Sequence, residues 1–162
     1  MNSLTPDRLF DLVAMQLGAP RYDGSNSFVK MFKPRFARLV ESGAKLQTIR
    51  PIPKRVPRVG DGLSLREWTG KSYRSEQRIL GRAFISALKI CRITDDGITL
   101  PSDVGGFMHS LGAPMTFLSG DFADMFARAD GFADWAEMRD WFKAEHGLPF
   151  VGLVYYWEGE AS

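Results

Sequence analysis

The chain has 162 residues, of which 44% are hydrophobic and 25% charged, and its formal net charge is +2. This composition is typical of one globular domain with a sizeable core and excludes a low-complexity protein. No apolar run approaches the roughly 18 residues of a membrane-spanning helix, and no secretory signal pattern opens the sequence. The single cysteine, Cys91, excludes an internal disulfide and a multi-cysteine zinc site. We therefore expect a cytoplasmic monomer without membrane contact, metal or cofactor.

The small net charge hides a strong asymmetry along the chain. Residues 30–92 hold 16 lysines and arginines against 4 acidic residues, whereas residues 93–162 hold 3 against 12. A locally basic surface attracts phosphate groups whatever the total charge of the protein. The sequence therefore predicts a basic, phosphate-binding face, with mutual pairing of the two charged halves as the alternative.

Helix and strand signals divide the chain into short elements. An N-terminal helix is predicted after the Thr5–Pro6 start signal and ends at Gly18. The signals that follow predict a strand over Ser27–Phe32 and a helix from Pro34 that Gly43 caps. Four further strands are predicted: Lys45–Arg50, Leu63–Trp68, Gln77–Ile93, which bends at Gly81, and Ile98–Leu100. Residues 101–114 are predicted to form a loop, followed by a short helix near Phe122–Phe126, a helix capped by Asp134 and Glu137 and ended by Gly147, and a last strand over Phe150–Trp157.

This order of elements predicts an α+β fold. Few residues separate the central strands, so we expect them to pair antiparallel. A small, mixed, mostly antiparallel β-barrel with helices at its side and an extra N-terminal helix fits the order of the elements.

Several short motifs resemble those of the ASCH family. They are Phe32–Phe36, Gly43–Arg50 with its Lys45 and Thr48-Ile49-Arg50, the Val59-Gly60-Asp61 turn, and a tail with Asp130-Gly131-Phe132, Trp135, Glu137-Met138, Trp141-Phe142 and the Phe150–Trp157 strand. The resemblance implies a PUA-like β-barrel. It divides the chain into an N-terminal helix and linker at 1–27, an ASCH domain at 28–157 and a tail at 158–162.

The resemblance also implies a function, because relatives are thought to bind RNA and some cleave it. One small bacterial branch removes the acetyl group of N4-acetylcytidine with a lysine, a threonine and an acidic residue, which match Lys45, Thr48 and Asp130. Lys45 would take the hydroxyl proton of Thr48, which attacks the acyl carbon, while Asp130 orients the lysine or shuttles protons. Alternating strand side chains point Lys45 and Thr48 to opposite faces, so this mechanism requires Lys45 to lie in the turn after Gly43 or across a bulge. The alternative is that Lys45 and Arg50 only contact phosphate and that Thr48 is an ordinary strand residue.

Two further groups of residues suit nucleic-acid binding. One is a proline-stiffened basic segment whose arginine forks match phosphate oxygens, and Arg35 precedes it; its members are Arg50, Lys54, Arg55 and Arg58. The other is a loop in which an aromatic ring stands between cations, as base stacking beside phosphate requires; it contains Lys71, Tyr73 and Arg74. The alternative for the first group is a solvated charged loop. In the second group, Trp68 at the start of the loop is expected in the core, and the sequence fits a core and a surface position of Tyr73 equally well.

The sequence therefore predicts a domain that binds RNA, a nucleotide or a nucleoside in a basic cleft. One alternative is a small hydrolase, either similar to the N4-acetylcytidine amidohydrolases or a ribonuclease, that uses Lys45, Thr48 and an acidic residue. A second alternative is a protein-interaction domain, which needs an exposed apolar patch inside the charged face.

Overall fold

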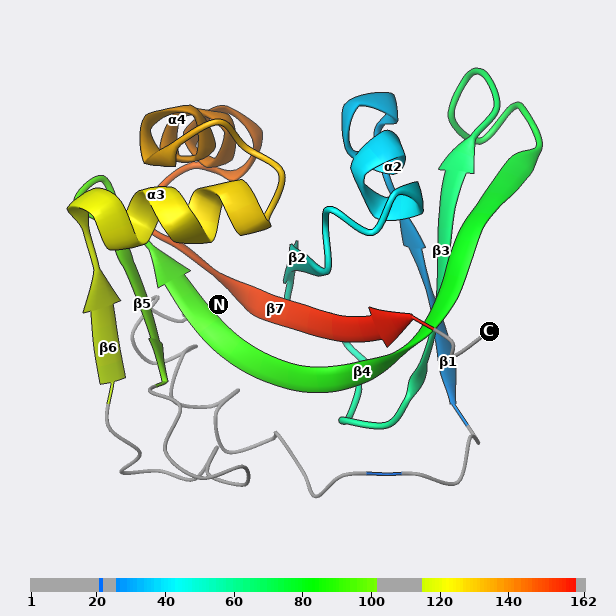
Figure 1. Ribbon diagram of the computed structural model, residues 1–162, viewed down its shortest axis with the longest axis horizontal. Coiled ribbons are helices and arrows are strands. Elements are labelled where there is room, and N and C mark those ends of the chain that lie inside the picture. The colour runs from blue at the N-terminus through cyan, green and yellow to red at the C-terminus, as the bar shows by residue number, and fades with distance from the viewer. Residues whose placement is uncertain (1–20, 22–25, 102–114, 160–162) are drawn as a thin grey trace, which may run out of the picture. The chain divides into compact units, whose positions relative to one another are not determined.

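The computed structural model describes Arg21, residues 26–101 and residues 115–159 (Figure 1). The predicted N-terminal helix and most of the predicted loop at 101–114 lie outside these residues. The described part has seven strands and three helices, so the α+β prediction is confirmed. None of its helices combines the length and the apolar character that crossing a bilayer requires.

The elements follow one another in an order close to the predicted one. They are β1 (Ser27–Met31), α2 (Pro34–Glu41), β2 (Gln47–Pro51), β3 (Gly62–Trp68), β4 (Gln77–Ile93), β5 (Ile98–Pro101), β6 (Met115–Leu118), α3 (Gly120–Ala129), α4 (Trp135–His146) and β7 (Phe150–Gly159). Strand β6 was not predicted, because its four residues are too few for a period-two pattern to emerge beside the helix that follows.

The strands form one sheet in the order β1-β3-β4-β5-β6, with β7 pairing to β4 and β2 pairing to β7. Strands β3, β4, β5 and β6 pair antiparallel in succession, which confirms the predicted pairing of the central strands, and β1 pairs with β3 in parallel. The described strands form an open sheet and do not close into the predicted, partly closed barrel. A barrel needs its two edge strands to pair, whereas β1 and β6 each have one partner strand there.

The chain divides into two compact units, which are described separately. The described part of unit 1 comprises residues 49–56, 89–101 and 115–154, and that of unit 2 comprises Arg21 and residues 26–48, 57–88 and 155–159. Strands β2, β4 and β7 each contribute residues to both units.

Unit 2 contains β1, β3, the first part of β4, and α2, which lies beside β3 (Figure 1). Pro34 at the first turn suits the start of α2, because its fixed φ is already helical and its missing N–H has no helical partner. The helix buries Phe36, Ala37 and Val40 on one face, and Gly43 follows it at a φ of 79° that a residue with a Cβ rarely adopts.

A register shift separates two parts of the β3–β4 ladder. Leu65 pairs with Gly81, but Arg66 pairs with Ile79, so Leu80 is an extra residue on β4. An inserted residue of this kind bends its strand and increases the local twist. The predicted bend near Gly81 is therefore confirmed.

Unit 1 contains helices α3 and α4, which pack against each other, and the antiparallel pair β5–β6 (Figure 1). The Asp134 carboxylate accepts a hydrogen bond from the Glu137 N–H at 2.8 Å, and the Glu137 carboxylate accepts one from the Ala133 N–H at 2.6 Å. This reciprocal pair confirms the predicted cap of α4. Phe142 on α4 is buried against the rings of Phe132 and Phe150, so this side of the helix packs into the core of unit 1.

Candidate nucleic-acid interface

The segment between α2 and the middle of β2 buries three polar side chains of unit 2. Lys45 is 2% exposed, Gln47 is 5% exposed and Thr48 is 4% exposed. Burying a charged or polar group costs free energy unless it is compensated, so such a cluster within four residues is unusual for a purely structural strand. The burial of these side chains marks the segment as a candidate for chemistry.

Lys45 lies in the turn after Gly43, because β2 begins only at Gln47. Its N–H donates to the Leu39 carbonyl of α2 at 2.9 Å, which ties the turn to the end of the helix. The next residue, Leu46, accepts a hydrogen bond at its carbonyl from the Trp157 N–H at 3.1 Å. Lys45 therefore occupies the position that the catalytic hypothesis requires of it.

Two cations of unit 2 share one aromatic ring. The Lys45 Nζ lies 5.2 Å from the centre of the Phe36 ring, and the Arg35 Cζ lies 4.8 Å from the same centre. The negative face of an aromatic ring attracts cations at these distances. The two groups lie no further apart than the sum of these distances, so the start of α2 and the turn before β2 bring two basic side chains close together.

The buried carboxylate of Asp61 has a structural role in unit 2. It is 1% exposed and accepts hydrogen bonds from the Arg21 Nε at 2.9 Å and from the Arg58 backbone N–H at 2.8 Å. The Asp61 N–H donates in turn to the Arg58 carbonyl at 3.0 Å. These contacts hold the loop before β3, and they leave the exposed side chain of Arg58 outside the pair.

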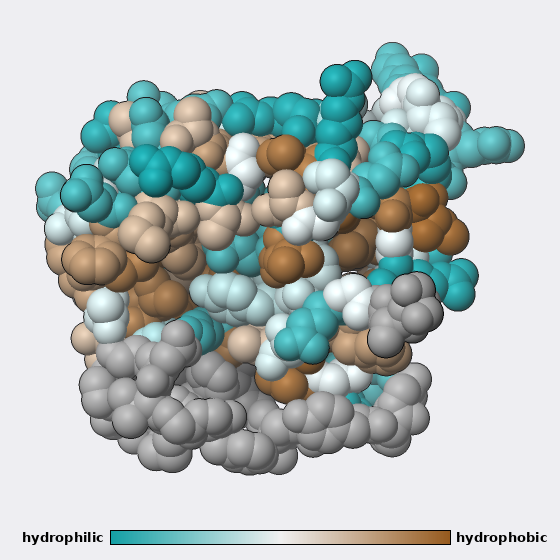
Figure 2. Space-filling view, viewed as in Figure 1, coloured by the Kyte–Doolittle hydropathy of each residue, from teal (hydrophilic) through white to brown (hydrophobic). Residues whose placement is uncertain are grey.

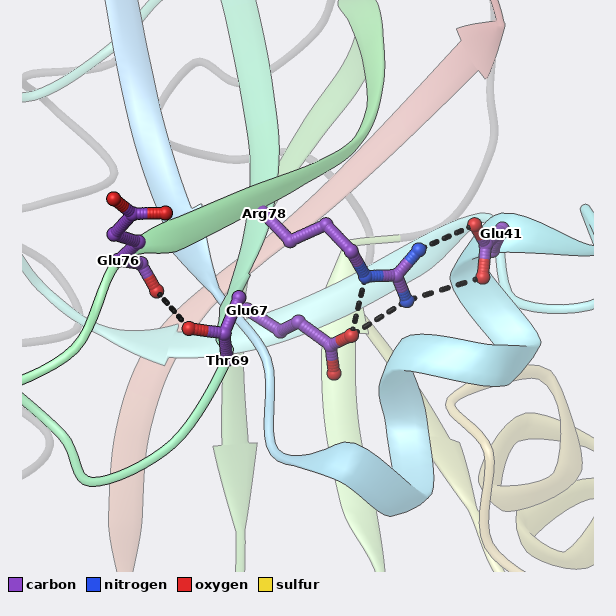
Figure 3. Close-up of polar contacts among 5 residues, drawn as sticks. All are labelled: Glu41, Glu67, Thr69, Glu76 and Arg78. Atoms are coloured by element: carbon purple, nitrogen blue, oxygen red, sulfur yellow. Dashed lines mark hydrogen bonds and ion pairs between the residues drawn. The ribbon is translucent and has the colours of Figure 1, made fainter.

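Arg78 at the start of β4 joins two acidic residues from different elements (Figure 3). Its guanidinium donates to Glu41 at the end of α2, at 2.7 Å, and to Glu67 on β3, at 2.8 Å. Hydrogen bonding and the charge of Arg78 lower the pKa of the Glu41 carboxyl below its ordinary value. The cluster lies on the surface, so its main consequence is to neutralise the two carboxylates and connect α2 to the β3–β4 hairpin.

The described part of unit 2 carries 12 lysines and arginines against 5 acidic residues, whereas that of unit 1 carries 8 against 9. Three of the five acidic residues of unit 2 (Glu41, Asp61 and Glu67) pair with Arg78 or Arg21. A group of exposed cations in unit 2 makes no ion pair with any described carboxylate; its members are Arg38, Arg58, Lys71, Arg74 and Arg82. The surface of unit 2 therefore has a surplus of positive charge.

The loop between β3 and β4 presents the predicted aromatic and basic side chains at its tip. The Tyr73 side chain is 89% exposed, and its ring centre lies 5.2 Å from that of Trp68, which is half-buried. Lys71 and Arg74 flank it and are exposed. Figure 2 shows hydrophilic residues over this hairpin tip, at the upper right.

Hydrogen bonds within the loop hold its tip in one conformation. The Thr69 N–H and hydroxyl both donate to the Glu76 carbonyl, at 2.9 and 3.0 Å, and the latter contact is drawn in Figure 3. The Ser75 hydroxyl donates to the Lys71 carbonyl at 2.9 Å. Tyr73 adopts a φ of 62°, a left-handed conformation that costs a non-glycine residue about 1 kcal/mol or more.

The remaining predicted site residues belong to unit 1. Arg50 is half-buried in β2, and Lys54 and Arg55 are exposed in the segment that follows, whereas Arg58 of the same predicted group belongs to unit 2. Asp130 ends α3 and is 4% exposed. Burial first, and then the charge of Asp130, raise the pKa of the Cys91 thiol, so the two side chains are electrostatic neighbours in unit 1.

The catalytic hypothesis therefore has two residues, Lys45 and Thr48, within unit 2, while Asp130 lies in unit 1. Across the described ranges, no three histidine, cysteine or acidic side chains converge as metal ligands would. Sequence analysis overlooked Arg82 and Phe84, although the alternation of Arg82-Ala83-Phe84-Ile85 on β4 is the period-two signal that could have identified them as surface residues.

Comparisons of the chain with protein-family models, with curated proteins and with solved structures give no significant match. The likeness to the ASCH family therefore rests on the sequence motifs, and the functional argument rests on the residues of the described structure.

Proposed function

We propose that this chain is an ASCH-type, PUA-like domain that binds RNA or a nucleotide through the cations of unit 2. The observation that carries the proposal is the group of exposed cations without an ion-pair partner among the described carboxylates. Such cations attract phosphate groups and release the counterions condensed on a nucleic acid. Arg35 and Lys45 at the Phe36 ring add to the same positive charge.

Binding of a labelled single-stranded RNA, measured by fluorescence anisotropy at several salt concentrations, tests the proposal. We expect the logarithm of affinity to fall linearly with the logarithm of salt concentration, with a slope of about −0.7 for each phosphate contact. Arg38→Gln and Arg58→Gln should each reduce the magnitude of that slope by about 0.7.

Arg128→Gln is the matched control for Arg38→Gln. Both arginines are exposed and lie in the last turn of a helix, but Arg128 belongs to unit 1. It should leave the slope unchanged. Absence of RNA and nucleotide binding, or binding that ignores salt, would overturn the proposal and favour a protein-docking domain.

A hydrolase is the second candidate, favoured by the position of Lys45 in the turn before β2 and by the burial of both Lys45 and Thr48. In this reaction Lys45 accepts the Thr48 hydroxyl proton, and the Thr48 oxygen attacks the acetyl carbon of N4-acetylcytidine as the C–N bond breaks. Cytidine leaves with the proton, and water then releases acetate from the threonine. The acidic partner Asp130 stays a prediction from the family resemblance.

Chromatographic detection of cytidine after incubation with N4-acetylcytidine tests this candidate. Lys45→Met and Thr48→Val should each abolish the product if the two residues are catalytic, whereas Arg128→Gln in unit 1 should keep turnover. No product from the unmodified protein would exclude the deacetylase. Shortened RNA in the same assay would instead identify a ribonuclease.

A further inference from the structure

The sheet of unit 2 has two faces of opposite character. Leu63, Leu65 and Ala83 point to one face and are buried. Glu67 and Arg78 point to that same face and join Glu41 of α2, so α2 lies on the buried side. The opposite face, called the outer face below, carries the side chains that alternate with these. Its central Ser64 is buried, whereas Val29, Ile79, Arg82 and Phe84 are exposed.

Cross-strand pairing defines the outer face. Ser64 on β3 pairs with Val29 of β1 and with Arg82 of β4, and Arg66 pairs with Ile79. Paired residues of neighbouring strands point to the same side of a sheet. A hydrogen bond from the Arg66 Nε to the Ser64 hydroxyl, at 2.8 Å, agrees with this placement.

The outer face exposes apolar side chains beside an arginine. Val29 is 49% exposed, Ile79 is 47% exposed and Phe84 is 52% exposed, while Arg82 stands between Ile79 and Phe84 on β4 and is exposed. Phe84 pairs with Gly62, so no cross-strand side chain covers its ring from β3. An accessible ring beside a cation is the arrangement that binds a stacked base and its phosphate.

The outer face continues into the hairpin tip. Trp68 follows Arg66 by two residues on β3 and points to the same side, and the Tyr73 ring lies against Trp68. Between its first residue, Gln77, and Phe84, β4 extends about 20 Å at the usual rise per residue. Rings therefore lie at the two ends of this length, Phe84 at one end and Trp68 with Tyr73 at the other, and Arg82 and Arg66 lie between them.

We propose that the outer face of the β1–β3–β4 sheet, together with the hairpin tip, binds single-stranded nucleic acid. Unpaired bases stack on Phe84 and Tyr73, and Arg82, Lys71 and Arg74 hold the phosphates between them. Hydrogen bonds within the loop favour this arrangement of its tip, which lowers the entropy lost on binding. A duplex keeps its bases stacked on each other, so it cannot use these rings. The inference rests on the proposed function; it names the substrate class and adds the sheet face with Arg82 and Phe84 to the loop that the sequence already indicated.

Anisotropy with a labelled oligouridine of about 12 nucleotides, a length within the range of such surfaces, tests the inference. Phe84→Ala and Tyr73→Ala should each weaken single-strand binding about tenfold. Phe84→Tyr and Tyr73→Phe keep the rings and should bind like the unmodified protein. Phe122→Ala removes a ring that is 69% exposed in unit 1 and serves as the matched control, with no expected change.

The outcomes separate the two proposals. If the unmodified protein binds no nucleic acid, the proposed function fails. If it binds in a salt-dependent way but both alanine variants bind as tightly, the outer-face inference is overturned and the proposed function stands. Equal affinity for the oligouridine and for an RNA duplex would also overturn the inference. All five substitutions fall on exposed rings, and thermal unfolding of each variant verifies that it is folded.

Discussion

Units 1 and 2 differ in both their surface charge and their interior. The described part of unit 2 has a net charge of +7 and that of unit 1 has −1. Of the seven polar or charged side chains that are buried in the described residues, unit 2 holds five and unit 1 holds Lys89 and Asp130. Because polar burial is costly, its concentration in the more basic unit identifies unit 2 as the better place to look for a ligand.

Both units also expose apolar residues. Unit 1 exposes Met115, Phe117, Phe122 and Met125, and Figure 2 shows hydrophobic residues over β6 and α3, at the left. In unit 2, Val29, Ile79 and Phe84 share one sheet face with the exposed Arg82. Apolar exposure occurs in both units, so it is the interleaved positive charge that distinguishes the proposed nucleic-acid surface.

Thiol labelling of Cys91 gives the largest expected effect and tests whether the interior of unit 1 is closed. Cys91 is 0% exposed, and its burial raises the pKa of the thiol, so both access and thiolate formation are suppressed. Labelling by a disulfide reagent should be at least about a thousandfold slower in the folded protein than in denaturant. Fast labelling under native conditions would show that unit 1 opens readily.

The next largest effect is expected for Phe142→Ala, which tests how much the aromatic core stabilises unit 1. Phe142 is 1% exposed and contacts several rings, so its removal leaves a cavity. We expect a loss of about 3–5 kcal/mol in the free energy of unfolding, measured by urea denaturation. An effect below about 1 kcal/mol would contradict the view that unit 1 is held by apolar packing.

Asp61→Asn tests how much the buried carboxylate of Asp61 stabilises unit 2. The substitution removes the charge that pairs with Arg21 and weakens the bond from the Arg58 N–H, and we expect a loss of about 2 kcal/mol in unfolding free energy. RNA affinity of the folded variant should stay close to that of the unmodified protein. A large loss of RNA binding without a loss of stability would instead make Asp61 part of the interface.

The smallest effect concerns Glu41 on the surface. Arg78 lowers the pKa of Glu41 below its ordinary value of 4.5, so the carboxylate stabilises the fold above that pH. This contribution disappears as the pH falls through the lowered pKa of the folded state. A carboxyl titration followed by NMR should place the midpoint of Glu41 below 4.5, and Arg78→Ala should return it to the ordinary value. An unchanged midpoint in that variant would show that the ion pair does not form in solution.

Short-range signals account for the parts of the fold that were predicted well. The cap of α4 depends on Asp134 and Glu137, which are three residues apart, and the end of α2 depends on Gly43 just beyond the helix. Strand β4 was predicted from end to end because its apolar and polar residues continue without a turn signal. The positions of Lys71, Tyr73 and Arg74 in an exposed loop also follow from local composition.

Long-range pairing accounts for what the sequence left open. The open sheet arises because β1 pairs in parallel with β3 and ends the sheet there. The sequence predicts a strand from Lys45, two residues before β2 begins at Gln47. Nothing in the composition of this segment shows that the Lys45 N–H bonds to the end of α2. Glu41 and Arg78 are 37 residues apart, and no sequence pattern indicates that they meet.

The amino-acid sequence by itself determined the helix ends, most of the strands and the clustering of positive charge, since these depend on neighbours within a few positions. Only the tertiary structure decided which cations are neutralised and which side of the sheet is exposed. Both depend on contacts between distant segments: Arg78 meets Glu41 and Glu67, and α2 covers the face opposite Arg82 and Phe84. These contacts form when apolar side chains pack, and the surface that results is a property of the packed unit.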